Sequence, residues 1–417
     1  MALAPAEGAV YTWSARLLGP YWGAVVGISD WLPGLLAAVS ALISFVTTLQ
    51  SLKAGWLAEP WQRGLVIMAL LLLLLLLGWQ RQRTVQRVVN ALSMLMLLIV
   101  ILSGICSLVL LQQRAWLLPP FWRAGWSANR PPSAPSSLAA LLYLGYSAPL
   151  SMAGELRPGL PPGRSLLGSA LLLSGSYLLL AFSALVAPSD EPGLVLEMAL
   201  GHAAGNLALV GLLAFYLCAA FVHTAACTRL LLVVSLDGLA PSGLARLNQQ
   251  RIPWRAFATQ TLLTGLVTIL LSVLLPQMHL ETVSTAIALP LLLATMALLR
   301  MFVSFFCFYI LILASYRGPE ARVNGRAGSP WLLWPTTATG VAGSTLVSLG
   351  ILAHSWTPAL PDATWTLLAG ILILLSIGTA TMAALPATAH AGHLGSLPAH
   401  GTAERADGAA SGAGPCP

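Results

Sequence analysis

Long apolar runs separated by short polar stretches make up most of the chain. A helix needs roughly 20 apolar residues to cross the hydrocarbon core of a bilayer, which is about 30 Å thick. Ten segments approach or exceed that length: 20–50, 64–79, 88–111, 138–154, 165–187, 205–228, 257–276, 281–315, 331–353 and 363–385. The pattern predicts an all-α polytopic membrane protein with about ten transmembrane helices.

The fourth of these segments, 138–154, is not written as an uninterrupted apolar helix. Gly145, Ser147 and Pro149 break its apolar run. In lipid, a broken helix is tolerated only where it is buried in protein or lines a polar cavity, because the freed backbone groups need partners. We therefore predict an unwound binding site at the centre of this segment, of the kind that transporters build from broken helices. A simple kink at Pro149 is the alternative.

Composition limits the class of protein before any motif is considered. Of the 417 residues, 57% are hydrophobic and 8% are charged, whereas about 25% of the residues of a soluble domain are charged. The five cysteines include no closely spaced pair, so we interpret them as packing residues rather than as disulfide or zinc-binding residues. No phosphate-binding loop, metal triad or nucleophile–base pair is present, which predicts no enzymatic activity, no cofactor and no metal site. The net charge of +7 is spread over short loops and does not indicate a nucleic-acid partner.

The distribution of basic residues predicts how the chain is oriented, because short cytoplasmic loops collect Lys and Arg. With a cytoplasmic N-terminus and a single helix at 281–315, fourteen basic residues lie inside and five outside. Two helices in that segment would change these numbers to eleven and eight. We therefore predict one helix at 281–315, both termini in the cytoplasm and a plasma (inner) membrane location. Residues 386–417, rich in Ala, Gly, Ser and His, are predicted to form a disordered cytoplasmic tail.

Three ionisable residues lie within apolar segments. Asp30 is eleven residues after Gly19, so a helix that starts at Gly19 places it about 16 Å deep in the membrane. Asp30 followed by Pro33 also fits the start of a helix, with Asp30 as its N-cap at the membrane surface, and both interpretations stay open. His223 is predicted either to relay protons or to form an interhelical hydrogen bond. Arg300 is expected to extend its side chain toward the cytoplasmic boundary or to pair with another residue near it.

Four short stretches of the chain occur in a characteristic order. The first comprises 5–13, 19–23 and Gly27; the second, 155–157 and 162–164; the third, 228–230 and 236–241; and the fourth, 244–248 and 251–253. Each stretch alone is a weak signal, but together they resemble motifs of the amino acid–polyamine–organocation (APC) superfamily of transporters.

The resemblance implies an inverted-repeat transporter fold, in which two repeats of five helices precede two further helices. Residues 1–385 would then form the transporter domain, with an incomplete first repeat at about 1–112, the second repeat at about 138–315 and the extra helices at 331–385. Because members of the superfamily have twelve helices, the chain is expected to be N-terminally truncated, without the first helix and most of the second. A broken helix without its partner predicts poor folding and no transport for the chain as given.

The resemblance also implies a function and a set of site residues. The chain is identified as a secondary active transporter of amino acids or related small organic amines, which works by alternating access around the broken helix, with H+, another ion or a counter-substrate as coupling partner. The implied substrate-binding residues are Tyr143, Gly145, Tyr146 and Ser147. The gating and coupling candidates are Asp30, Glu155, Arg157 and His223, of which Glu155 and Arg157 also fit a solvated cluster at the membrane surface. The alternative is a non-transporting truncated remnant, or a membrane scaffold or sensor with the same fold.

Overall fold

A computed structural model of the chain describes residues 9–52, 55–80, 82–113, 162–186, 192–248, 252–274, 287–316, 330–357 and 359–394. All regular secondary structure within these ranges is helical. The predicted broken segment at 138–154 lies outside the described residues. The site residues predicted on or beside it lie outside them too: Tyr143, Gly145, Tyr146, Ser147, Glu155 and Arg157.

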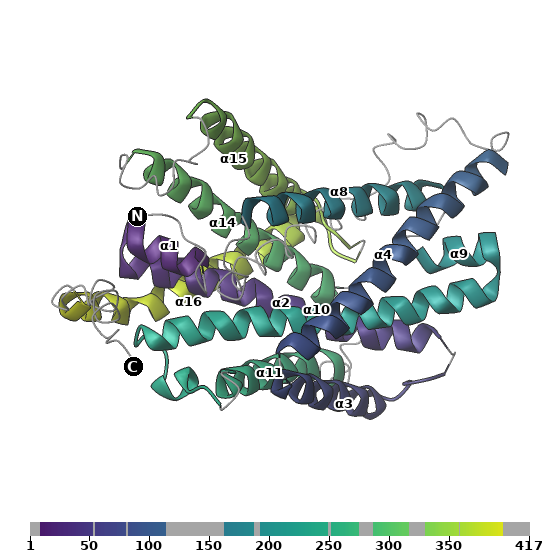
Figure 1. Ribbon diagram of the computed structural model, residues 1–417, viewed down its shortest axis with the longest axis horizontal. Coiled ribbons are helices and arrows are strands. Elements are labelled where there is room, and N and C mark those ends of the chain that lie inside the picture. Colours follow the sequence, from purple (N-terminus) through teal and green to yellow (C-terminus); the bar gives the residue numbers. More distant parts are fainter. Residues whose placement is uncertain are drawn as a thin grey trace, which may run out of the picture.

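Eleven α-helices run through the described part of the chain (Figure 1). In chain order they are α1 (Ala9–Leu18), α2 (Pro20–Ser51), α3 (Pro60–Trp79), α4 (Gln82–Gln113), α8 (Pro162–Val186), α9 (Pro192–Leu200), α10 (His202–Leu236), α11 (Trp254–Ile269), α14 (Leu289–Tyr316), α15 (Pro330–Ala353) and α16 (Asp362–Leu394). The 3-10 turn η2 (Ser242–Ala245) lies between α10 and α11, and the π-helical turn η3 (Leu270–Leu274) continues α11.

Nine of the ten predicted membrane segments coincide with these helices. Eight helices of the described residues are long and apolar enough to cross a bilayer: α2, α3, α4, α10, α11 with η3, α14, α15 and α16. Helix α8 contains a shorter apolar stretch, Leu167–Ser183. The segment predicted at 281–315 is the single helix α14 over its described residues, and the segment predicted at 205–228 lies within the longer helix α10.

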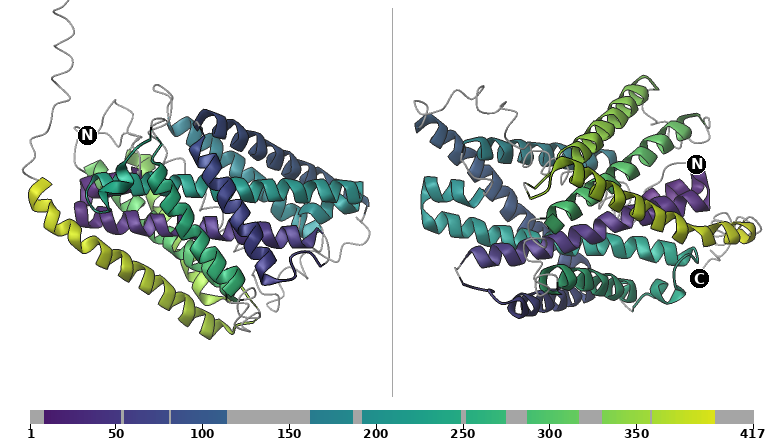
Figure 2. Two further views of the ribbon diagram at one scale, coloured as in Figure 1. Left: turned by 90° about the horizontal axis from the view of Figure 1, so that it is seen from below. Right: turned by 180° about the vertical axis from the view of Figure 1, so that it is seen from behind.

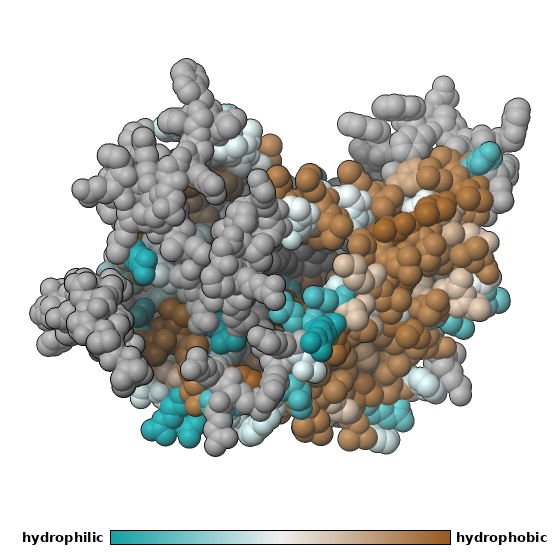
Figure 3. Space-filling model, in the orientation of Figure 1, coloured by the Kyte–Doolittle hydropathy of each residue, from teal (hydrophilic) through white to brown (hydrophobic). Residues whose placement is uncertain are grey.

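Helix α2 lies at the centre of the bundle. It packs against α10, α1, α14, α16 and α11, and Figures 1 and 2 show it running beside α10 along the length of the molecule. Helix α3 packs on α11, and α4 packs on α8, α9 and α10. Exposed apolar side chains such as Met94, Leu98 and Leu108 cover the outer face of α4 (Figure 3). A helical bundle with this outer surface is suited to the hydrocarbon of a bilayer.

The start of α2 is set by Gly19 and Pro20. Gly19 has a φ of 98°, which favours glycine, and Pro20 takes the first helical position, where a missing N–H breaks no hydrogen bond. Asp30 is therefore an interior residue of α2, and its interpretation as an N-cap is wrong. Because the earlier Gly-Pro signal starts the helix, Pro33 falls inside it and removes the N–H that would bond to the carbonyl of Ser29.

Two glycines of the first motif allow α1 to fold back against α2. A Cβ atom at Gly23 would lie 2.5 Å from the Cβ of Ala15, and one at Gly27 would lie 2.8 Å from the ring of Tyr11. Real Cβ atoms do not approach other atoms this closely, so a larger residue at either position would separate the two helices. The spacing of glycines in the motif thus reflects a close helix–helix contact.

A hydrogen bond joins the first motif to the third. The hydroxyl of Tyr11 donates to Oδ2 of Asp237 at 2.5 Å, across 226 positions of sequence. Asp237 ends α10, and the hydroxyl of Ser235 in the last turn of that helix donates to the carbonyl of Pro241 at 2.7 Å. Burial, together with the hydrogen bond to Asp237 and its negative charge, raises the pKa of Tyr11 above its usual value.

The contact between α2 and α10 also depends on a glycine. Gly34 is buried, and a Cβ atom at this position would overlap Sγ of Cys227. The thiol of Cys227 donates to the carbonyl of Trp31 at 3.5 Å, so the sulfur lies directly on the backbone of α2. Helices α2 and α10, which pack extensively on one another, therefore meet at a site with no room for an additional methyl group.

We expect Gly34→Ala to destabilise the protein by about 1–3 kcal/mol, because the new methyl group overpacks the α2–α10 contact. The loss should be smaller when Cys227→Ala removes the sulfur in the same protein, since the two residues compete for one space. Thermal unfolding of the purified protein in detergent measures both effects. Gly350→Ala is the control, because a Cβ there meets nothing within 4 Å; equal effects at positions 34 and 350 would refute the overpacking.

The raised pKa of Tyr11 predicts a loss of stability at high pH. The folded state favours the protonated hydroxyl, so its contribution is complete below the pKa of about 10 of a tyrosine in an unfolded chain and is lost as the pH rises above it. The unfolding temperature should fall less steeply between pH 9 and 11 in Tyr11→Phe than in the wild type. Tyr309→Phe, at a 52% exposed position, should follow the wild type, and parallel curves for all three proteins would contradict the assignment.

Candidate functional site

A buried ion pair connects the first half of α2 to the middle of α14. Nη1 of Arg300 donates to Oδ1 of Asp30, and the two side chains are 3% and 5% exposed. Asp30 is ten residues from the start of α2 and Arg300 eleven from the start of α14, which at 1.5 Å per residue is about 15–16 Å along each helix. The pair therefore lies well inside two helices that are long and apolar enough to cross a bilayer.

The pairing follows from the cost of placing charge in hydrocarbon. Among the described residues, Asp30 and Arg300 are the two charged side chains that are buried. A charge in the membrane interior is retained only where an opposite charge or other polar group stabilises it, and such residues mark functional sites. Arg300 is therefore paired, as one of its two expected arrangements requires, and its partner is Asp30.

Three further residues lie within electrostatic reach of the pair. Arg300 acts on His223 of α10, and both Asp30 and Arg300 act on Cys227 of α10 and Cys307 of α14. Two of the predicted coupling candidates, Asp30 and His223, therefore lie at one location in the bundle. This location lies where α2 packs against both α10 and α14, two of its most extensive contacts in the described structure.

From Trp31, the residue next to Asp30, polar contacts continue into α11. The indole N–H of Trp31 donates to Oε1 of Gln260 at 2.8 Å, and Gln260 is fully buried. Within the described part of the chain, Nε2 of Gln260 and the hydroxyls of Thr264 and Thr224 have no hydrogen-bond partner. Unpaired polar groups of this kind are costly in an apolar interior and are normally satisfied by water or a ligand.

Sequence reasoning missed Gln260 and Trp31, although a signal for Gln260 was present. Gln260, Thr264 and Thr268 recur every four residues in an otherwise apolar segment, which places three polar side chains on one face of α11. The structure buries that face toward the centre of the bundle. A polar stripe on a membrane-spanning helix indicates contact with other protein helices rather than with lipid.

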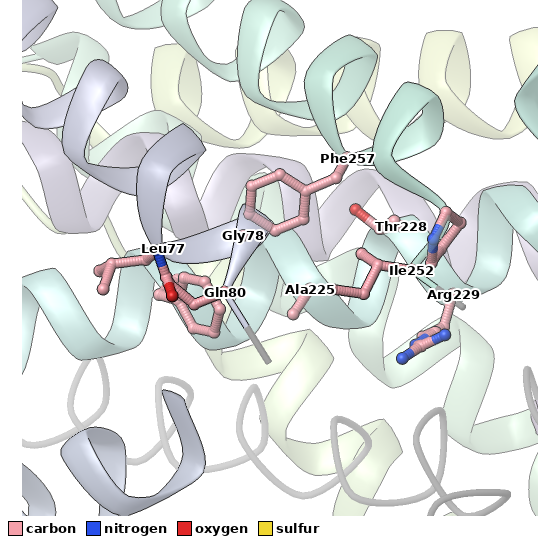
Figure 4. A pocket seen from close by; sticks show the side chains of 10 residues that line it. Leu77, Gly78, Gln80, Ala225, Thr228, Arg229, Ile252 and Phe257 are labelled. Carbon is pink, nitrogen blue, oxygen red and sulfur yellow. The ribbon is translucent and has the colours of Figure 1, made fainter. Parts of the chain in front are cut away.

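A small pocket lies where α3, α10 and α11 meet (Figure 4). Phe257 of α11 lies against Gly78 of α3 so closely that a Cβ at position 78 would overlap the ring. Thr228 and Arg229 of the third motif and Pro253 of the fourth line the same pocket. Two motifs separated in sequence are thus brought together at a mainly apolar junction, which we interpret as a packing contact.

A metal site is not formed by the described residues, because no group of three or more His, Cys, Asp or Glu side chains in that part of the chain has suitable geometry. The arrangement that the structure does build is electrostatic. A buried, electrically neutral pair has a histidine and two thiols beside it, and unpaired amide and hydroxyl groups lie on the neighbouring helices α10 and α11. Such a site can bind charged or polar groups and protons.

A family model described as amino acid permease matches residues 1–377, which is most of the chain. The matched range includes α1 to α15, the ion pair and all four motifs. No curated protein matches the chain significantly.

Removal of one partner of the ion pair should destabilise the protein more than removal of both, because a single buried charge is left unpaired. Arg300→Met alone leaves Asp30 buried without its counter-charge, and we expect a loss of about 3–5 kcal/mol. The double variant with Asp30→Leu should recover most of that loss, because both charges are then replaced by apolar groups. Thermal unfolding in detergent measures each variant, with Arg255→Met as the control at an exposed arginine. If Arg300→Met were as mild as Arg255→Met, the pair would have no structural role.

Proposed function

Because the chain belongs to the amino acid permease family, we propose that it is a secondary active transporter of amino acids or related small organic amines. The protein is an integral membrane protein of a transporter family, with eight helices in its described part that are long and apolar enough to cross a bilayer. The observation that carries the proposal is the family match over residues 1–377, which extends through the membrane segments as well as the loops.

We infer that the substrate binds at the break in segment 138–154. Gly145 allows close approach to the backbone, and the free N–H groups of an unwound turn can receive a carboxylate. Tyr143, Tyr146 and Ser147 would supply aromatic faces and hydroxyls to the rest of the substrate. The interrupted sequence of this segment supports the proposal, as does the general use of broken helices as binding sites in transporters.

We propose that four ionisable residues couple and gate transport. Asp30 and His223 are the proposed coupling residues, because intramembrane ionisable groups are functional by default and these two lie at one location between α2, α10 and α14. Glu155 and Arg157 are the proposed gate at the end of the broken segment. The excess of basic residues in one set of loops supports a plasma-membrane orientation with both termini in the cytoplasm.

Gly145→Leu should abolish saturable uptake, since the added side chain fills the space in which the substrate meets the backbone. Uptake of radiolabelled amino acids and amines by proteoliposomes, with and without a pH gradient, measures the effect. Gly168→Leu is the matched control, because it adds the same side chain to a glycine of α8 where a Cβ meets nothing within 4 Å. Its uptake should equal that of the wild type.

Two outcomes would overturn the proposal. Equal uptake by Gly145→Leu and the wild type would place the substrate site elsewhere. A folded, monodisperse wild-type protein that transports no compound of the panel in either direction would instead favour a scaffold or sensor with the same fold.

A further inference from the structure

We propose that the connection between α10 and α11, together with the end of α3, binds the phosphate headgroup of an anionic phospholipid from the surrounding bilayer. The site consists of Trp79, Arg246, Leu247, Trp254 and Arg255, which we call the arginine–tryptophan patch. The inference goes beyond the proposed function, because it concerns the surface that meets lipid and does not depend on what the protein transports.

The patch lies where two membrane-spanning helices end. Trp79 is the last residue of the apolar span of α3, and Trp254 is the first residue of the apolar span of α11. Their rings are in contact, with centroids 5.8 Å apart, yet the two residues are 56% and 39% exposed. Exposed tryptophans at the ends of spans are typical of the boundary between hydrocarbon and lipid headgroups. The patch is therefore at the depth of the headgroups.

Two exposed arginines lie beside the tryptophans. Within the described part of the chain, neither Arg246 nor Arg255 takes part in a hydrogen bond or an ion pair. Nη1 of Arg255 lies 3.7 Å from where a Cβ of Gly243 would be, so its guanidinium is next to the turn η2, and Arg246 directly follows that turn. Guanidinium groups bind phosphate oxygens through paired hydrogen bonds, and two of them on one short stretch of surface suit a phosphate group.

Hydrogen bonds of the connection itself hold the arginines in place. The backbone N–H of Asn248 donates to the carbonyl of Ile252 at 2.9 Å, and the N–H of Ile252 donates to Oδ1 of Asn248 at 2.9 Å. At the other end of the connection, the hydroxyl of Ser235 donates to the carbonyl of Pro241. A site that is already ordered loses less conformational freedom when it binds a ligand.

The chain supplies little negative charge to balance the patch. Residues 60–154 and 238–280 contain no Asp or Glu, and Asp237, at the end of α10, accepts the hydrogen bond of Tyr11. Leu236 and Leu247 are exposed beside the arginines, which suits contact with acyl chains rather than with water. Positive charge next to apolar and aromatic side chains at this depth fits an anionic phospholipid.

The pocket of Figure 4 adjoins the patch. Gly78 and Gln80, on either side of Trp79 in the sequence, line this pocket together with Pro253, the residue before Trp254. Its walls are mainly apolar, so a shallow recess for the glycerol and acyl part of a lipid lies next to the charged groups. A bound lipid would then contact both α3 and α11 and stabilise their packing.

The test compares two lipids of different headgroup charge on the purified full chain. Phosphatidylglycerol added to the detergent-solubilised protein should raise its unfolding temperature by about 2–4 °C relative to equal phosphatidylcholine. Arg246→Gln/Arg255→Gln should lose most of this difference. Arg16→Gln/Arg405→Gln is the matched control, because it removes the same charge from α1 and from the C-terminal part of the chain, and it should keep the difference. In phosphatidylcholine, all three proteins should unfold at the same temperature.

A soluble phosphate compound distinguishes the two sources of the phosphate group. Glycerol 3-phosphate carries the phosphate without acyl chains, and at the same concentration it should leave the unfolding temperature unchanged. Stabilisation equal to that by phosphatidylglycerol would assign the patch to a soluble phosphate compound and overturn the lipid site. Native mass spectrometry provides a second measurement, in which Arg246→Gln/Arg255→Gln should retain at least one phosphatidylglycerol molecule fewer than the wild type.

Two further outcomes would refute the proposal. An undiminished response of Arg246→Gln/Arg255→Gln to phosphatidylglycerol, with the same number of bound lipids, would place the lipid elsewhere on the protein. Equal losses in this variant and in Arg16→Gln/Arg405→Gln would show a general attraction between net positive charge and anionic lipid rather than a site. None of these measurements uses uptake, so they leave the proposed transport function to its own test.

Discussion

A charge at the middle of a bilayer has to find its counter-charge within the protein, and the centre of this bundle is organised by that requirement. Arg300 belongs to α14 and forms an ion pair with Asp30 of α2. Helix α2 also carries the contacts to α1, α10, α11 and α16. The helix that contacts most of the others therefore carries one half of a buried ion pair, and loss of either partner would leave an uncompensated charge in the apolar interior.

Close helix contacts allow this arrangement. Gly23 and Gly27 allow α1 to pack closely on α2, and Gly34 leaves room for the sulfur of Cys227 on α10. Three glycines of α2 therefore allow close contact with two neighbouring helices. The hydrogen bond from Tyr11 to Asp237 then fastens α1 to the end of α10. In a bilayer, where the hydrophobic effect does not drive helices together, close packing of small residues and hydrogen bonds between helices supply much of the cohesion.

Features that depend on a continuous stretch of residues, such as a membrane-spanning helix, could be predicted from the sequence. Contacts between residues far apart in the chain could not. Eight predicted segments coincide with helices long and apolar enough to cross a bilayer, and a ninth coincides with α8, because crossing a bilayer requires a long apolar run whatever the fold. The partner of Arg300 could not be predicted, since nothing in the sequence connects it to a residue 270 positions earlier. Asp30 was ambiguous because Asp followed by Pro is a valid helix start, and only the stronger signal at Gly19 and Pro20 decided the matter. Gln260 was overlooked although the polar stripe that contains it was visible.

The proline inside α2 has a consequence for the charged site beside it. Pro33 leaves the carbonyl of Ser29 without its helical donor, and Asp30 is the next residue. A carbonyl oxygen freed in this way adds negative potential to the same turn that carries the carboxylate, and it can coordinate a water molecule or a cation beside the ion pair. That turn also lacks one backbone hydrogen bond of the helix. We therefore expect α2 to bend most easily at the turn that carries Asp30. Movement of Asp30 toward or away from Arg300 therefore requires only a local bend of α2, while the glycine contacts on either side of that turn stay in place.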